Sequence, residues 1–345
     1  MVAAEGIRCL TSDEFCLRVL PTHRRAEAPD WVEHVTLGVD VQESSLWWVV
    51  AGIGTDFRGI VLDYGVWPDQ GSIDYLSLAD IDRTMVKATG IKNPAEALLA
   101  GLNQLRSERL AAAYTRDDGS VMRVNQMVVD SGYRSEVVYR FSQEHQAVMP
   151  SHGKGVTAKS KPWSQERRKI GERIGFRWRM PPSKGTRAPR YLLIDTNTWK
   201  TTLNEFWTLP LNDPGSWSLY RAAPLRHRMI ADNLSAEYPV KTYGHGRELY
   251  EWTNRPGRDN HLLDATILAA VAGSVLGVAV PGESSRVANR RRVSLSQGGK
   301  SSAVPANANQ AVSEQEERLA TVQNYASQPS GKLSLAELRA MKRKS

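Results

Sequence analysis

The chain has 345 residues, of which 41% are hydrophobic, and a formal net charge of +8. That length and composition are sufficient for one large or two modest domains with a buried core, so we expect a folded soluble protein. The N-terminus holds no long apolar stretch, and the most apolar later segment is interrupted by a charge. This excludes a secretory signal and a membrane span, and predicts a cytoplasmic protein that has no membrane partner.

The positive charge is concentrated in two segments. Residues 151–190 carry 12 Lys and Arg against 2 Glu, and residues 281–345 carry 11 against 5, so the rest of the chain is net negative. Clustered positive charge is typical of proteins that bind a polyanion through its phosphates. The alternative is a solvated loop and a flexible tail that only keep the chain in solution.

Residues 1–30 are polar and are interrupted by Pro21 and Pro29, which predicts a lead-in or linker rather than a domain. The two cysteines of the chain, Cys9 and Cys16, fall in this segment. Without a second pair they form neither a disulfide framework nor a thiolate zinc site. We expect both to be free thiols.

Three apolar segments follow at about 35–41, 46–53 and 59–66, joined by short polar links. Their β-branched and aromatic residues predict an antiparallel meander of three strands. Asp40 lies at the end of the first strand, where a charge is costly unless another group pairs with it. Alternatively, Asp40 only starts the turn between the first two strands.

Asn93, Pro94 and Glu96 form a helix N-cap signature, and the apolar spacing after it predicts a helix to about Ala113. A short apolar strand ending at Asp130 comes next, followed by an amphipathic helix. Strands and helices that alternate after a meander indicate a mixed sheet with crossovers.

A right-handed crossover would place the strand that ends at Asp130 parallel and adjacent to the strand that ends at Asp40. Both aspartates would then project from the carboxyl edge of the sheet, where open α/β folds bind their ligands. Two carboxylates that reach one edge independently indicate a functional site.

A further strand is predicted at 191–194, a helix at about 198–209, and a buried helix at 261–277, which is apolar on all sides and holds one charge, Asp264. In the first turn of its helix, Asp264 could simply complement the helix dipole. Its apolar neighbours suggest instead that this helix end packs on the sheet, where a buried carboxylate takes up a proton or binds a cation.

The domain boundaries follow from these patterns. We assign residues 31–280 to one α/β domain that carries the basic segment 151–190 as an insertion. Residues 281–345 are too polar to bury a core and are predicted to form a flexible tail. Within the tail, residues 332–343 could form a short amphipathic helix on a partner.

Asp40, Asp130 and Asp264 are the predicted catalytic residues and metal ligands. Three carboxylates within roughly 5 Å would repel one another by a few kcal/mol per pair, so they imply bound cations. Carboxylate oxygens favour Mg²⁺ or Mn²⁺ over zinc. Two such ions can activate water and stabilise the leaving oxygen of a displacement at phosphorus, which predicts a metal-dependent nuclease.

Several motifs resemble the nuclease domain of lambda-type bacteriophage terminase large subunits, over about residues 20–275. They are GVDVQ at 38–42, DYG at 63–65, VVDSGYRSEVVYRF at 128–141, EW at 251–252 and NHLLDATILAA at 260–270. The resemblance implies an RNase H-like fold, a mixed sheet flanked by helices, and endonucleolytic cutting of concatemeric viral DNA with Mg²⁺ or Mn²⁺. It places the metal ligands at Asp40, Asp130 and Asp264, and implies double-stranded DNA, a small terminase subunit and the portal as partners.

The basic segment would lie along the DNA. Its predicted nucleic-acid-binding residues are Lys154, Arg167, Arg168, Lys169, Arg177 and Arg179. Trp178, within this run, is the aromatic residue we would test for DNA contact. Asp195 is a further or alternative metal ligand, although a helix cap is the favoured interpretation. His261 either contacts a phosphate or orients a ligand, or it only packs in the core.

The N-terminal segment departs from the resemblance. Terminase large subunits normally carry a packaging ATPase before the nuclease, whereas about thirty residues precede the first predicted strand here. The resemblance then implies a separate ATPase chain, or a split, truncated or decayed gene product. Two other functions stay open: a non-catalytic DNA-binding packaging component, and a resolvase- or transposase-like nuclease of RNase H-like fold.

Overall fold

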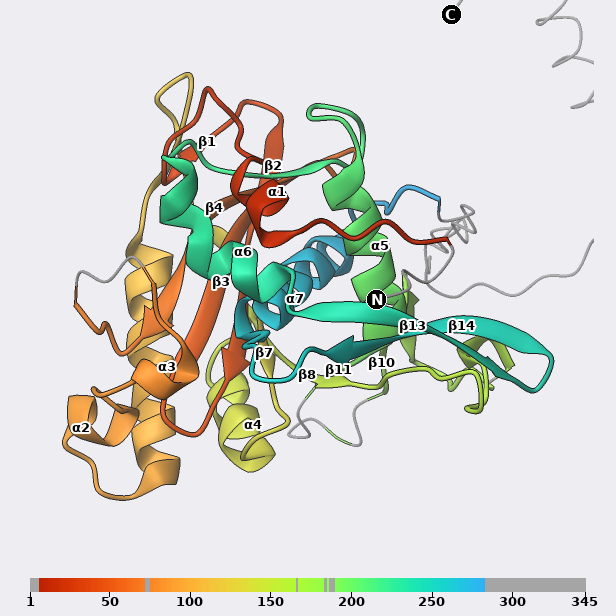
Figure 1. Cartoon of the computed structure of the whole chain (residues 1–345). Helices are drawn as coiled ribbons and strands as arrows, with labels where there is room; N and C mark the ends of the chain where they lie inside the picture. Colours follow the sequence, from red (N-terminus) through yellow and green to blue (C-terminus); the bar gives the residue numbers. More distant parts are fainter. Residues whose placement is uncertain (1–5, 72–74, 166, 183–184, 186–189, 283–345) are drawn as a thin grey trace, which may run out of the picture. The chain divides into compact units, whose positions relative to one another are not determined.

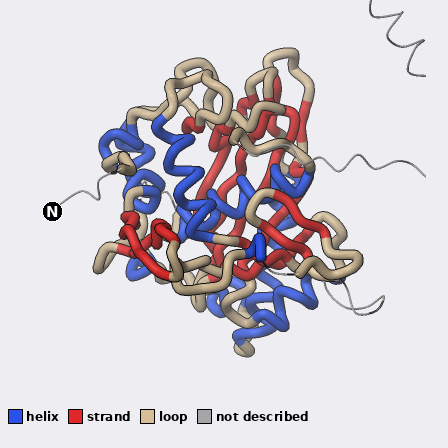
Figure 2. The backbone as a smooth tube through the Cα atoms, turned by 90° about the vertical axis from the view of Figure 1, so that its right-hand side faces the viewer, coloured by secondary structure: helices blue, strands red, loops and turns tan. Residues whose placement is uncertain are grey.

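The computed structural model describes residues 6–282, except 72–74, 166, 183–184 and 186–189. In this part of the chain, nine strands form one large mixed sheet with helices on both faces, as Figures 1 and 2 show. The predicted mixed α/β class is therefore confirmed. The predicted tail and its helix at 332–343 lie outside the described residues.

The predicted meander is present in this sheet. Strands β2 (Val32–Val41), β3 (Leu46–Gly54) and β4 (Gly59–Trp67) pair antiparallel in chain order. Nearly all of their residues are buried, because helices cover both faces of the sheet. This explains why the segments read as continuous apolar runs without polar alternation.

The predicted crossover is also present. Strand β7 (Val124–Asp130) lies parallel and adjacent to β2. The sheet has the spatial order β12-β4-β3-β2-β7-β8-β11-β10-β9. The remaining strands of this sheet are β8 (Val148–Gly153), β9 (Arg173–Gly175), β10 (Trp178–Met180), β11 (Leu192–Ile194) and β12 (Trp217–Leu219).

Helix α7 (His261–Leu276) packs against β2, β3 and β7 on one face of the sheet. It is buried on almost all sides, as its composition predicts. Gly38 of β2 permits this close approach, because a Cβ atom there would lie 1.9 Å from the carbonyl oxygen of Ala265. The opposite face is covered by α3 (Pro94–Ala111) and α4 (Ser135–Gln143), whose apolar residues form a second core cluster.

The other elements lie around the sheet and the helices that cover its two faces. They are α1 (Ser12–Cys16), β1 (Glu27–Ala28), η1 (Leu78–Asp80), α2 (Met85–Thr89), β5 (Tyr114–Arg116), β6 (Val121–Met122), η2 (Trp163–Gln165), α5 (Thr196–Thr208), η3 (Pro224–His227), α6 (Arg228–Leu234), β13 (Glu237–Gly244) and β14 (Arg247–Asn254). Strands β13 and β14 form a two-stranded arm that contacts α5 (Figure 1).

Part of the predicted lead-in packs on the domain. Phe15 of α1 is buried, and its ring meets Trp207 edge-on at a centroid distance of 5.5 Å. Cys9 and Cys16 are free thiols, as predicted. No helix among the described residues is both long and apolar enough to span a lipid bilayer.

Candidate metal centre

Asp40 and Asp130 lie side by side at the carboxyl ends of two parallel strands. Val39 of β2 pairs with Val129 of β7, so the next residue of each strand reaches the same edge. Neighbouring strands are about 4.8 Å apart, which brings the two carboxylates together. Both project toward the α7 face, because they share the side-chain alternation of Gly38, which faces that helix.

Asp264 joins this pair from the first turn of α7. Burial, together with the negative charges of Asp40 and Asp264, raises the pKa of Asp130 to about 7, whereas the backbone N–H of Gly132 opposes this change. The charges of Asp40 and Asp264 therefore act on Asp130 and disfavour its ionised form. The three aspartates that the sequence singled out are near enough for their charges to interact, and their role as metal ligands stays a prediction.

His261 and Gln42 hold the carboxylate of Asp40. The Nδ1 atom of His261 lies 3.0 Å from Asp40 Oδ2, and Gln42 Nε2 donates to the same oxygen at 2.8 Å. Burial lowers the pKa of His261, but the hydrogen bond to Asp40 and the charges of nearby aspartates outweigh it and raise the pKa overall. Trp47 packs on the imidazole ring, with the ring centroids 5.2 Å apart. His261 therefore orients Asp40 and does more than fill space.

Lys200, Glu237 and Asn260 surround Asp264, and the sequence predicted none of them as site residues. Lys200 Nζ lies 3.2 Å from Asp264 Oδ1 and 2.5 Å from Glu237 Oε1. Asn260 Nδ2 donates to Asp264 Oδ2 at 3.0 Å and to Glu237 Oε1 at 2.7 Å. Burial raises the pKa of Asp264, and the ammonium group of Lys200 counteracts this effect.

The donor set fits a hard divalent cation, since carboxylate oxygens are the ligands that Mg²⁺ and Mn²⁺ prefer. The pKa of Asp130 is raised mainly by burial, and the negative charges of Asp40 and Asp264 raise it further. In the part of the chain that the structure describes, however, no three His, Cys, Asp or Glu side chains are already arranged to hold a metal ion. Asp264 faces Lys200 and Asn260, which accounts for the incomplete set.

One comparison with known proteins shows the family of the chain. The family model of the terminase large subunit gpA endonuclease domain matches residues 8–318. The chain belongs to the gpA endonuclease family. No curated protein and no solved structure matches it.

Most of the basic residues predicted to bind DNA are exposed in this gpA endonuclease domain. The exposed ones are Lys154, Arg167, Arg168, Lys169 and Arg177. Arg179 requires a correction, because it is only 7% exposed and donates to the carbonyl oxygen of Trp163 at 2.7 Å. It also lies 3.9 Å from Glu172, so its guanidinium stabilises the domain and is not available to DNA.

Trp178, which the sequence singled out for a test of DNA contact, is a core residue. Its side chain is 3% exposed, and its indole N–H donates to Ser274 of α7 at 3.0 Å. Asp195 is the N-cap of α5, where its carboxylate accepts from the backbone N–H of Thr198, so the helix-cap interpretation is confirmed.

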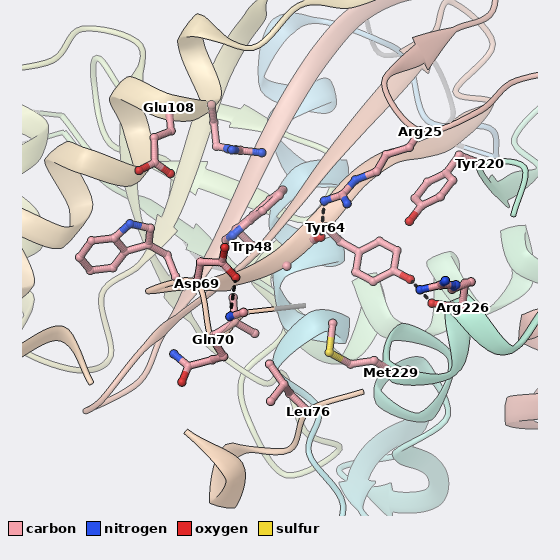
Figure 3. A pocket seen from close by; sticks show the side chains of 15 residues that line it. Arg25, Trp48, Tyr64, Asp69, Gln70, Leu76, Glu108, Tyr220, Arg226 and Met229 are labelled. Carbon is pink, nitrogen blue, oxygen red and sulfur yellow. Dashed lines mark hydrogen bonds between the residues drawn. The ribbon is translucent and has the colours of Figure 1, made fainter. Parts of the chain in front are cut away.

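A cavity of about 580 Å³ lies beside the carboxyl half of β4 in the gpA endonuclease domain (Figure 3). Its wall includes Arg25 and Arg109, which both form ion pairs with the buried Asp63. None of the three site aspartates lines it. The cavity is therefore separate from the candidate metal centre.

Proposed function

We propose that the chain is a Mg²⁺- or Mn²⁺-dependent endonuclease that cuts concatemeric viral DNA during phage genome packaging. Membership of the gpA endonuclease family supports a nuclease role in packaging. The observation that carries the proposal is the meeting of Asp40 and Asp130 at adjacent strand ends, with Asp264 near enough to raise the pKa of Asp130.

In this proposal, Asp40, Asp130 and Asp264 hold the divalent cation or cations. Such ions activate a water molecule and stabilise the leaving oxygen at phosphorus. Within the chain, His261 and Gln42 orient Asp40, and the backbone N–H of Gly132 orients Asp130 at 3.1 Å. The two-ion scheme predicted from the sequence requires Asp264 to share an ion while it also contacts Lys200.

The same proposal includes an RNase H-like fold. An antiparallel three-strand meander, followed by parallel strands on one side of β2, supports an RNase H-like arrangement. The exposed basic residues of the segment 151–190 would contact DNA phosphates. The proposed partners are double-stranded DNA, a packaging ATPase, a small terminase subunit and the portal, in the cytoplasm of the bacterial host.

Cleavage of supercoiled plasmid in the presence of Mn²⁺ tests the proposal. We expect the wild-type chain to nick and linearise the plasmid, and Asp40→Asn to abolish this activity. Asp195→Asn is the matched control, because Asn also caps helices and this residue lies outside the proposed centre. Equal cleavage by wild type and Asp40→Asn would refute the assignment, and no cleavage by any of the three would favour a non-catalytic DNA-binding role.

A further inference from the structure

Lys200 places a positive charge directly beside the candidate metal centre. Its ammonium group lies between Glu237 Oε1 and Asp264 Oδ1, at 2.5 and 3.2 Å. The side chains of Lys200 and Glu237 are 12% and 3% exposed. The ammonium group thus occupies a position between two carboxylates that a bound cation could also occupy.

This lysine is fixed in place by the pairing of Glu237. Asn260 donates to the same Glu237 oxygen, whereas Glu237 Oε2 is buried and has no hydrogen-bond partner among the residues that the structure describes. If Lys200 moved away, the buried carboxylate of Glu237 would lose its counterion, which is strongly unfavourable in a protein interior. The pairing with Glu237 therefore favours a position of the ammonium group beside Asp264.

The backbone that carries Lys200 is also anchored. Trp199, its neighbour in α5, is fully buried. Two hydrogen bonds join α5 to Trp252 of β14: the Trp252 backbone N–H donates to Asn197, and its indole N–H donates to Thr201, each at 3.0 Å. These contacts hold the helix, and with it the ammonium group, against the centre.

We propose that Lys200 supplies one of the two positive charges on which the centre depends, so that one divalent ion is sufficient, for which Asp40 and Asp130 would supply carboxylate oxygens. Asp264 then holds the ammonium group and does not share a second ion. This inference rests on the proposed nuclease function and replaces the two-ion scheme. It agrees with the lack of a set of three metal ligands among the described residues.

Mn²⁺ binding to the full chain, counted by equilibrium dialysis and by electron paramagnetic resonance, tests the inference. We expect one ion per wild-type chain. In Lys200→Met, a neutral side chain of similar length leaves Asp264 and Glu237 without their counterion, and a second ion should bind. Because this variant leaves Glu237 buried and unpaired, Lys200→Met/Glu237→Gln provides a second protein that still frees Asp264 and should also bind two ions.

Lys241→Met is the matched control. Lys241 pairs with Glu248 on the β13–β14 arm, so its loss should leave the count at one ion. Cleavage kinetics give an independent measurement: at subsaturating Mn²⁺, halving its concentration should lower the wild-type rate twofold and the double-variant rate fourfold.

Two bound ions and a fourfold rate response in the wild type would overturn the role of Lys200 but leave the proposed nuclease function intact. An unchanged count in both Lys200 variants would also overturn it. Absence of both Mn²⁺ binding and cleavage in the wild type would instead remove the nuclease function itself, together with this inference.

Discussion

The Nδ1 atom of His261 lies 3.0 Å from the Oδ2 atom of Asp40, although the two residues are 221 positions apart in the chain. Asp40 is the last residue but one of strand β2, and His261 is the first residue of α7. The contact therefore joins the edge of the sheet to the start of the helix that carries Asp264. One hydrogen bond connects two of the three elements that form the candidate centre.

We expect His261→Ala to lower the cleavage rate by about 10- to 100-fold, because residues that orient a metal ligand typically contribute this much. The fold should persist, since the imidazole lies at the edge of the core. Initial rates of plasmid cleavage at several Mn²⁺ concentrations measure the effect. His34→Ala is the control, because His34 lies on the same strand near its other end; equal losses in both variants would contradict the orienting role.

The meander and the adjacency of Asp40 to Asp130 could be predicted from the sequence, since buried strands and their order depend on local patterns. The continuous apolar runs identified β2, β3 and β4, and the crossover rule then placed β7 beside β2. Asp264 was found because it is the one charge in an otherwise apolar helix. In each case the signal lay within a single segment.

Lys200 and Glu237 could not be predicted in the same way. Lys200 lies in an ordinary mixed helix, and Glu237 begins a strand of the arm, so only the tertiary structure brings them together. The burial of Arg179 and Trp178 could not be predicted for a related reason. Their run of basic residues reads as a solvated loop, but it contains the short strand β10, all three residues of which are buried.

The pKa of Asp130 predicts an unusual pH dependence of stability in the metal-free protein. The pKa of Asp130 in the folded state, about 7, lies above the ordinary value of 3.8. Between these two pH values the folded protein keeps the proton on Asp130, whereas the unfolded chain has released it. Stability should therefore fall as the pH rises from about 4 to 7 and then level off. At pH 8, Asp130→Asn should raise the free energy of unfolding by about 2 kcal/mol, after allowance for partial solvent screening.

Urea unfolding with EDTA at pH 5 and pH 8 measures this effect. The gain in Asp130→Asn should be larger at pH 8, and the same substitution should abolish plasmid cleavage. Mn²⁺ should stabilise the wild type at pH 8 but not the variant. If the free energy of unfolding of the two proteins changed with pH in the same way, the pKa of Asp130 would not be raised in the folded state.

The exposed basic residues should contribute to DNA affinity by neutralising phosphates. We expect Arg167→Ala/Lys169→Ala to weaken binding to duplex DNA of any sequence. The dependence of log K on log salt should become shallower by about 0.9 for each phosphate that the protein no longer neutralises. Fluorescence anisotropy with a labelled duplex, in a buffer that contains Ca²⁺ and at several salt concentrations, measures both the affinity and its salt dependence.

The matched control for DNA binding is Arg24→Ala/Arg123→Ala, which removes the same charge. Both residues are exposed, and Arg123 directly precedes β7, at the end of that strand opposite to Asp130. The salt dependence of DNA binding by this control variant should equal that of the wild type. If both double variants reduced the slope equally, general charge and not the basic segment would account for binding.

The close packing of α7 on β2 should be essential to both stability and activity. A Cβ atom at position 38 would lie 1.9 Å from the carbonyl oxygen of Ala265 and 2.6 Å from the backbone nitrogen of Ala269. Because both are backbone atoms, Gly38→Ala can be accommodated only if the helix moves away from the sheet. That movement would separate Asp264 from Asp40, so we expect a loss of about 3 kcal/mol in stability, at the upper end for overpacking, and little remaining cleavage. Thermal unfolding and plasmid cleavage measure the two effects, and a variant with wild-type values for both would show that the approach of α7 does not determine the geometry of the centre.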